Sequence, residues 1–145
     1  MASKRWVIGN DHAGLPLKNT VLETLRALGH AIEDLGANTT ESVDYPEFGR
    51  AVANAIAEGR ADRGVLICGT GIGISIAANR VKGIRAALCG DVFSAKACRQ
   101  HNDANVLALG ARIVGPGHAE EIVRAFATTA FEGGRHQRRI DKIDG

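Results

Sequence analysis

The sequence predicts a doubly wound α/β domain, in which helices cover both faces of a parallel sheet. Short apolar segments alternate with helical patterns at a spacing of about 25–30 residues, which is typical of βαβ units. The apolar segments are too short to form helices, whereas the segments between them carry their apolar residues on one helical stripe. Right-handed crossovers between parallel strands then place helices on both faces of the sheet.

Five strands and five helices are expected along the chain. The first half contains strands at residues 5–9 and 31–35 and helices at about 16–28 and 45–58. The second half contains strands at 64–68, 84–89 and 104–109 and helices at about 74–81, 92–100 and 116–127. Pro16 and Pro46 lie near helix starts, where the missing N–H of proline costs no hydrogen bond. Gly133 and Gly134 break the chain before a basic tail.

The composition indicates a single domain over residues 1–145, with 45% hydrophobic and 23% charged residues. The net charge of +2 and an aromatic content of 4% give no basic, stacking surface, so no nucleic-acid partner is expected. No segment approaches the roughly 18 apolar residues of a membrane span, and the first residues lack the apolar core of a secretory signal. Three cysteines without a CxxC pair fit reduced thiols. We therefore expect a cytoplasmic protein without a membrane partner.

A glycine-rich loop follows the third strand, in the segment ICGTGIGISIAAN. Glycines at a helix start let backbone N–H groups approach a ligand, and the helix end adds partial positive charge, which favours an anion. The loop has neither the lysine of a phosphate-binding P-loop nor the spacing of a dinucleotide fold, so a plain tight turn is the alternative. Cys68 and Thr70 stand at its entrance. A thiolate of Cys68 would be stabilised there and could act as a base or nucleophile, or Cys68 could be a small buried residue.

Further polar residues follow the strands. Because the carboxyl ends of parallel strands meet at one edge, Asp11, His12, Cys68, Thr70 and Arg112 should converge there. An alternative is that the residues after the first strand merely cap a helix.

Two histidines, His12 and His101, are expected near one edge, which makes acid–base work or metal binding conceivable. No HxH, HExxH or CxxC spacing supports a metal. Arg135 and Arg139 lie four residues apart, a spacing that suits a phosphate or a solvated basic tail. Cys89 and Cys98 have no comparable setting and are expected to be packing residues.

Several strings together resemble the ribose-5-phosphate isomerase B family of sugar-phosphate isomerases, over residues 7–140. They are GNDHAG, DYP, ICGTGIGISIAAN, RQHNDANVLALG and EGGRHQRR. The resemblance implies a Rossmann-like three-layer α/β/α sandwich with a five-stranded parallel sheet and no metal or organic cofactor. It also implies a homodimer or dimer of dimers whose active sites straddle the interface, and reversible conversion of ribose 5-phosphate to ribulose 5-phosphate.

The same resemblance implies roles for individual residues. Cys68 would be the base that moves the proton between C2 and C1, and Thr70 would assist proton transfer between the oxygens. Asp11 and His101 are similar to the groups that open the sugar ring, and Tyr45 and Asn102 to sugar contacts. The backbone of the glycine loop would hold the enediolate, through Gly69, Gly71, Ile72 and Gly73. The phosphate would be bound by His12, Arg112, Arg135, His136 and Arg139, with the tail arginines reaching in from a partner subunit.

Two other functions are compatible with the sequence. A tetrose or hexose phosphate, such as erythrulose 4-phosphate, allose 6-phosphate or galactose 6-phosphate, could be the substrate of the same chemistry. A non-catalytic sugar-phosphate sensor is disfavoured, because a sensor needs no base and this chain has Cys68 together with Thr70, Asp11 and His101.

Overall fold

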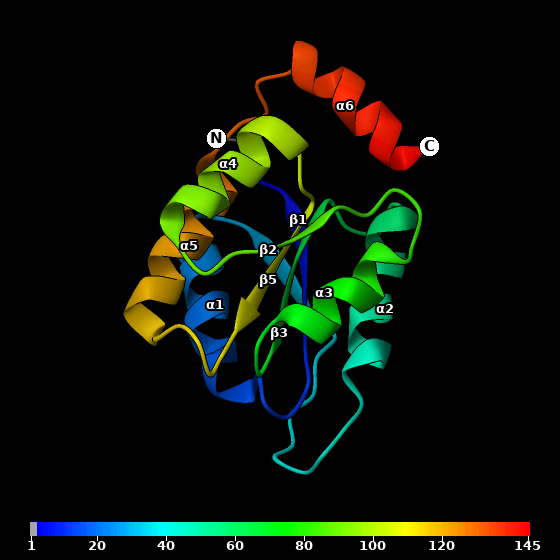
Figure 1. Ribbon diagram of the computed structural model, residues 1–145. Helices are drawn as coiled ribbons and strands as arrows, with labels where there is room; N and C mark the ends of the chain where they lie inside the picture. Colours follow the sequence, from blue (N-terminus) through cyan, green and yellow to red (C-terminus); the bar gives the residue numbers. More distant parts are fainter. Residues whose placement is uncertain (1–2) are drawn as a thin grey trace.

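The computed structural model describes residues 3–145 and contains a five-stranded parallel sheet with helices on both sides (Figure 1). The strands are β1 (Arg5–Asn10), β2 (Ala31–Asp34), β3 (Arg63–Cys68), β4 (Ala86–Leu88) and β5 (Val106–Gly110). The helices are α1 (Leu15–Ala27), α2 (Tyr45–Ala57), α3 (Ile72–Asn79), α4 (Val92–Asn102), α5 (Pro116–Thr128) and α6 (Arg135–Asp144). The strand order is β2-β1-β3-β5-β4, and every pair is parallel, which confirms the predicted fold class.

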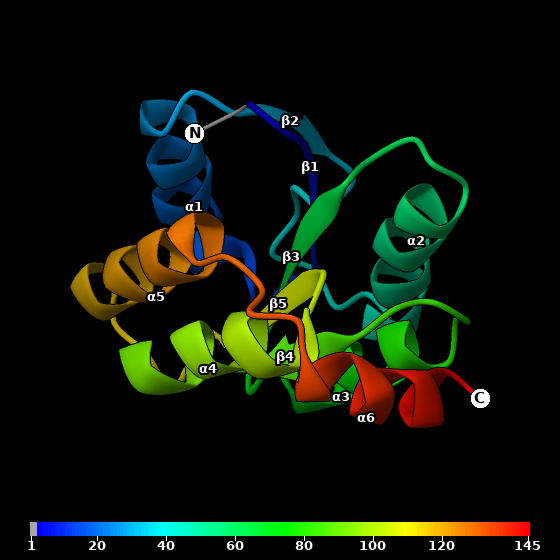
Figure 2. The same cartoon turned by 90° about the horizontal axis from the view of Figure 1, so that it is seen from above.

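The helices form two layers, with α1, α4 and α5 on one face of the sheet and α2 and α3 on the other (Figure 2). Each face has its own apolar core. Trp6 and Phe126 are fully buried in the larger core, and Val52 in the smaller one. Successive residues of a strand point to opposite faces, so Val65 belongs to the first core and its neighbour Leu66 to the second. The central strands are thus buried on both sides, as a parallel sheet requires.

The strand β4 is shorter than the sequence predicts, with three residues where six were expected, and β5 starts at Val106. The segments that precede β4 and β5 explain why both strands start later than predicted. The backbone N–H of Arg85 donates to Asn105 Oδ1 at 2.8 Å, a side-chain bond that replaces a strand ladder bond. Asp103 has a left-handed backbone with φ of 46°, which ends α4 and delays the start of β5. The predicted strands are correct in number and order; β1, β2 and β3 differ from the prediction by one residue each, and β4 and β5 by more.

The helix α6 stands at the end of the sheet where the strands begin, beside the end of α4 (Figure 1). Within it, His136 and Ile140 are buried and the other side chains are largely exposed. Its far end is held by an ion pair between Asp144 Oδ2 and Arg85 Nη1 at 3.0 Å. The basic tail of the sequence is therefore an ordered helix. Across residues 3–145, no helix combines the length and the apolar character needed to cross a membrane.

Candidate active site

A cleft of about 570 Å³ opens at the edge of the sheet where the strands end, which we call the carboxyl edge. It is lined by Asp11, His12, Ala13, Tyr45, Cys68, Gly69, Thr70, Ile72, Gly73, Ile76 and Arg112. The lining comes from the segments that follow β1, β3 and β5 and from the start of α2. The predicted convergence of polar residues after three strands is thus present in a single cavity.

Cys68 is the last residue of β3 and is 5% exposed. Its Sγ accepts a hydrogen bond from the backbone N–H of Gly71 at 3.1 Å. Gly71 caps α3 with φ of 80°, a left-handed conformation, and a Cβ added there would lie 2.5 Å from Leu88 Cδ1. Only glycine fits this turn without strain. The turn therefore presents a backbone donor to the sulfur, an arrangement that stabilises a thiolate.

Thr70 is exposed in the cleft, and its Oγ1 accepts the backbone N–H of Ile72 at 3.2 Å. The first hydrogen bond of the helix turn runs from Ser75 N–H to Gly71 O at 3.3 Å. The amides before it, including that of Gly73, belong to the helix start, whose N–H groups have no partner within the helix. This part of the loop can therefore bind an anion beside the thiol.

Asp11 and His12 follow β1 and are both held by backbone donors. One oxygen of the buried Asp11 carboxylate, Oδ1, accepts the N–H of Gly14 at 2.9 Å. The ring of His12 accepts the N–H of Val43 on Nδ1 at 3.1 Å. In a neutral imidazole this fixes the proton on Nε2, which makes Nε2 a donor.

Tyr45 and Arg112 lie directly against the glycine loop. A Cβ on Gly73 would be 2.5 Å from Tyr45 Cε1, and a Cβ on Gly69 would be 3.3 Å from Arg112 Nη1. The two glycines thus allow the ring and the guanidinium to approach the backbone closely. Arg112 takes part in none of the ion pairs formed within residues 3–145, so its charge is available to a ligand.

His101 and Asn102 do not join this cleft. They end α4, the helix that leads into β5, and therefore lie at the edge where strands begin, which we call the amino edge (Figure 1). The expectation that His12 and His101 share one edge is wrong. In a parallel sheet the segment before a strand lies opposite the segment that follows it.

The tail residues join His101 at the amino edge. The rings of His101 and His136 are stacked, with centroids 4.6 Å apart and an interplanar angle of 23°. Burial lowers the pKa of His136, and the nearby charges of Arg135 and Arg139 lower that pKa further. The buried Nε2 of His136 has no hydrogen-bond partner among the described residues, and Glu132 Oε1 lies 3.7 Å away.

The two imidazoles and the Glu132 carboxylate are the one group within residues 3–145 that could hold a metal ion, with donor atoms within 4.8 Å of one another. Histidine and glutamate form zinc sites in proteins, although two arginines on the same helix oppose a cation here. Glu132 was not singled out from the sequence. The sequence feature that could have identified Glu132 is its position four residues before His136.

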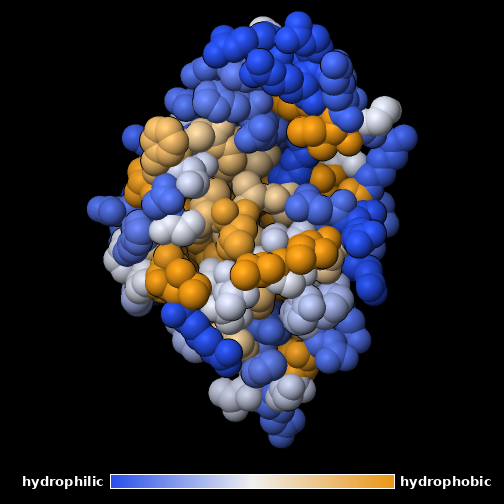
Figure 3. Space-filling model, in the orientation of Figure 1, coloured by the Kyte–Doolittle hydropathy of each residue, from blue (hydrophilic) through white to orange (hydrophobic). Residues whose placement is uncertain are grey.

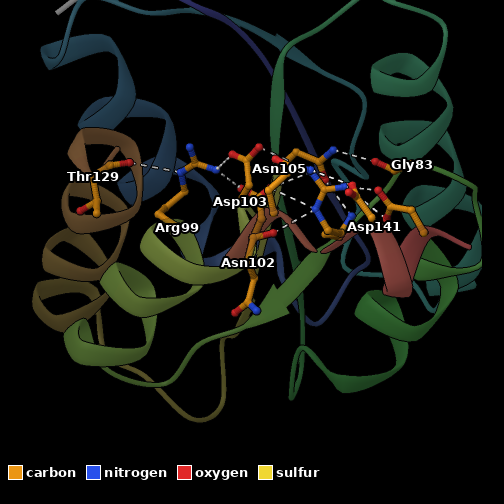
Figure 4. Close-up of polar contacts among 11 residues, drawn as sticks. Gly83, Arg99, Asn102, Asp103, Asn105, Thr129 and Asp141 are labelled. Carbon is orange, nitrogen blue, oxygen red and sulfur yellow. Dashed lines mark hydrogen bonds and ion pairs between the residues drawn. The ribbon is translucent and has the colours of Figure 1, made fainter. Parts of the chain in front are cut away.

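A network of polar side chains fixes the amino edge (Figure 4). Arg85 donates from Nε to the backbone oxygen of Asn102 at 3.0 Å, and Arg99 pairs through Nη1 with Asp103 Oδ1 at 2.8 Å. The side-chain amide of Asn102 points away from this network in Figure 4. These contacts hold the end of α4 in place, and His101 and Asn102 are exposed there.

Hydrophobic side chains gather in the middle of the face of the molecule that Figure 3 shows. A neighbouring cavity of about 300 Å³ shares Thr70 and Ile72 with the cleft and is otherwise mostly apolar. The large exposed hydrophobic residues that line these cavities are Tyr45, Ile72, Ile76, Leu88 and Ile113. Sequence reasoning missed this apolar patch, because its members lie on separate elements and form no pattern along the chain.

Cys89 and Cys98 are buried, as expected for packing residues, and their Sγ atoms are 3.9 Å apart. Neither lines the carboxyl-edge cleft. Cys68 is the thiol that does.

Comparisons with known proteins agree with this geometry. The family model described as Ribose/Galactose Isomerase matches residues 6–143. The chain is 48% identical to ribose-5-phosphate isomerase B of Escherichia coli, over 97% of this chain and 94% of that protein. It is 45% identical to D-erythrulose-4-phosphate isomerase of Pectobacterium atrosepticum, over 94% and 90% of the two chains.

The structure is also similar to that of ribose-5-phosphate isomerase B from Mycoplasma genitalium with bound ribulose-5-phosphate. The TM-score is 0.92 at 45% identity, over 97% of this chain and 93% of that one. The chain belongs to the ribose/galactose isomerase family.

Proposed function

We propose that this member of the ribose/galactose isomerase family interconverts D-ribose 5-phosphate and D-ribulose 5-phosphate. The observation that carries the proposal is the thiol of Cys68, which faces a cleft of substrate size and accepts a backbone N–H at 3.1 Å. A buried thiol that only packs needs neither feature. The reaction is a step of the pentose phosphate pathway, and we place it in the cytoplasm.

Cys68 acts as the base. Its thiolate removes the proton from C2 of the open-chain aldose, the C1 carbonyl oxygen becomes the enediolate oxygen, and the thiol returns the proton to C1. The hydroxyl of Thr70 assists the accompanying proton shift between O2 and O1. The net change is the move of two hydrogens within one molecule, so the reaction needs no external oxidant or reductant.

The start of α3 stabilises the enediolate. Negative charge develops on the oxygens only as the C2 proton leaves, so preorganised donors bind the transition state more tightly than the substrate. The unpaired amides at Gly73 and the following residue provide such donors, together with the positive end of the helix. The hydrogen bonds of Gly71 to Cys68 and of Ile72 to Thr70 hold the two reacting side chains in register.

Further residues at this edge position the substrate. Asp11 has one oxygen held by Gly14, which leaves the other for a sugar hydroxyl during ring opening. Tyr45 lies against the loop as a sugar contact. His12, through Nε2–H, and Arg112, through its unpaired guanidinium, donate to the phosphate.

The remaining predicted residues lie at the amino edge, so one chain alone does not assemble the site. We infer a homodimer in which the amino edge of one subunit meets the carboxyl edge of the other. His101 and Asn102 then contact the sugar, and Arg135, His136 and Arg139 contact the phosphate of the partner's site. The exposed apolar patch around the cleft supports this interface, because patches of this kind mark protein contacts.

Complementation between two impaired variants, assayed at a substrate concentration well below KM, tests this arrangement. Cys68→Ser and Arg139→Ala would be purified separately, then mixed, unfolded and refolded together. Random pairing makes about half of the dimers mixed. Each mixed dimer has one intact site out of two, so activity should recover to about a quarter of wild type. Each variant refolded alone is the control. A mixture that stays as inactive as its components would show that each site uses residues of one subunit only.

A tetrose phosphate is the second candidate substrate. Similarity to an erythrulose-4-phosphate isomerase, at nearly the identity seen to the pentose enzyme, favours it. Ketose formation from four-, five- and six-carbon aldose phosphates would separate the two by their kcat/KM values. Highest turnover of ribose 5-phosphate supports the proposal, and binding without turnover of any sugar phosphate contradicts it.

A further inference from the structure

A second, basic pocket lies at the amino edge, apart from the substrate residues. Its volume is about 240 Å³, and Lys4, Arg63 and Arg99 line it together with residues 127–131, which end α5 and begin its connection to α6. It shares no residue with the cleft at Cys68. Three cationic residues and no acidic residue line this small cavity, and of the three only Arg99 forms an ion pair within residues 3–145, with Asp103.

Arg63 is the residue of this pocket whose charge is least compensated. Its guanidinium packs 6.0 Å from the centre of the Phe126 ring. The Nη1 atom is sealed from water and has no hydrogen-bond partner within residues 3–145. The side chain appears in none of the hydrogen bonds or ion pairs of that part of the chain, which is unusual because a guanidinium carries five donors.

Arg99 increases this imbalance. Its guanidinium lies 5.9 Å from the centre of the same Phe126 ring, so two like charges flank one aromatic side chain. Burial and the charge of Arg99 together lower the pKa of Arg63 to about 10, at which Arg63 stays protonated at neutral pH. The two positive charges therefore persist side by side in the folded protein.

The carboxylates near the pocket are already engaged. Asp103 Oδ1 pairs with Arg99 Nη1 at 2.8 Å and its Oδ2 lies 3.7 Å from Arg85. Asp62 pairs with Arg5 at 3.3 Å. Arg63 is partly buried, with its Nη1 atom sealed from water, and a partly desolvated charge without a partner favours a counter-ion.

We propose that this pocket binds a small oxyanion, of the phosphate, sulfate or carboxylate class, between the guanidinium of Arg63 and the ammonium of Lys4. Planar guanidinium groups match the paired oxygens of such anions. The volume admits an anion of a few heavy atoms. The site is independent of catalysis, since its residues are not those assigned to the substrate.

Thermal unfolding tests the proposal. Wild-type protein would be unfolded at pH 7.5 in sodium chloride and in sodium phosphate, sulfate or acetate at equal ionic strength, so that screening is constant. At about ten times Kd a bound anion should raise Tm by roughly 3–6 °C. Arg63→Met should be at least as stable in chloride, because it removes an unpaired charge, and it should lose this anion-dependent rise.

Two controls separate this pocket from the substrate site. Arg63→Met keeps every residue proposed to bind the sugar phosphate. Anion bound at the substrate site therefore raises Tm equally in wild type and variant, and only the difference between their Tm increases reports on the new pocket. Arg60→Met removes a neighbouring exposed arginine that is paired with Glu58 and should behave as wild type. Lys4→Met, at the rim, should weaken the response partly, and it serves if Arg63→Met fails to fold.

An equal response of wild type and Arg63→Met to all three anions would overturn the proposal. A response to phosphate and sulfate that exceeds the response to acetate, and that disappears in the variant, would support it and assign a tetrahedral anion. The reverse order would support it and assign a carboxylate.

Discussion

The two edges of the sheet are built in different ways. At the carboxyl edge, main-chain atoms hold the functional side chains: amides of Gly71, Ile72 and Gly14 donate to Cys68, Thr70 and Asp11. At the amino edge, side chains do this work, through the ion pairs of Arg85 and Arg99 with aspartates (Figure 4). The first edge presents a thiol and backbone donors beside His12 and Arg112, and the second presents the imidazoles and guanidiniums of α4 and α6.

This difference indicates a division of chemistry. Backbone donors are fixed by the fold and suit the reacting atoms, where a small displacement is costly. Long cationic side chains suit a phosphate, which must be captured and released. If the proposed dimer is correct, variants of the reacting residues Cys68 and Thr70 at the carboxyl edge should mainly change kcat, and variants of the α6 arginines at the amino edge should mainly change KM.

Cys68→Ser is the strongest test of the carboxyl edge. Serine is a far weaker base at neutral pH, so kcat should fall on the order of 10²-fold or more while sugar-phosphate affinity stays nearly intact. Steady-state kinetics and calorimetric titration with substrate measure the two quantities. Unchanged turnover would remove Cys68 from its assigned role.

Arg139→Ala is the matching test of the amino edge. Loss of one charge-assisted hydrogen bond to phosphate should raise KM roughly 10- to 100-fold, with a smaller change in kcat. Arg138→Ala, one position along the same exposed helix, is the matched control and should leave KM unchanged. If both variants raise KM equally, α6 acts through its overall charge and the division between the edges is not specific.

Gly71→Ala tests the backbone turn at the carboxyl edge through its effect on the free energy of unfolding. The added Cβ is strained by the left-handed backbone and would also lie 2.5 Å from Leu88 and 2.9 Å from the backbone of Leu109, so we expect a loss of about 1–3 kcal/mol in unfolding free energy. Gly59→Ala is matched in φ, at 79° against 80°, and has open space around it. Denaturant unfolding should show a larger loss for Gly71→Ala. Equal losses would mean that backbone conformation alone makes Gly71 necessary.

His30, which precedes β2 at the amino edge, should make stability depend on pH, and this is the smallest effect expected. Burial lowers the pKa of His30, and the charges of Arg63 and Lys4 lower that pKa further. A depressed histidine pKa means that the unfolded chain binds more protons below about pH 6.5, so the folded protein loses stability as pH falls through that value.

The variant His30→Asn removes this proton site, and its amide oxygen can replace Nδ1 as acceptor for the N–H of Lys4. Urea unfolding between pH 7.5 and 5.5 should show a shallower loss for the variant. His136 contributes with the same sign in both proteins. Parallel curves would show that His30 does not carry the dependence.

Most of the fold follows from local patterns in the sequence. The number, order and parallel pairing of the strands, and the convergence of Asp11, Cys68 and Arg112 in one cleft, result from strand periodicity and from the rule that strand ends meet at one edge. The exact limits of β4 and β5 could not be predicted from local patterns. They depend on a side-chain hydrogen bond between Arg85 and Asn105, which lie twenty residues apart.

The amino-edge part of the candidate site was identified by resemblance and not by geometry. Its members, such as His101 and His136, are brought together by the return of α6 to the end of α4, a contact that no local pattern encodes. The basic pocket at Arg63 was likewise not predicted, because its cations come from the chain start, β3 and α4.

The short β4 also has a consequence for behaviour at high concentration. The two outer strands of the sheet, β2 and β4, have only four and three residues. An outer strand exposes unpaired N–H and C=O groups to which a strand of another molecule can add, and the tendency grows with strand length. Brief outer strands leave little template for such growth. We therefore expect the folded protein to resist fibril-like aggregation when it is concentrated.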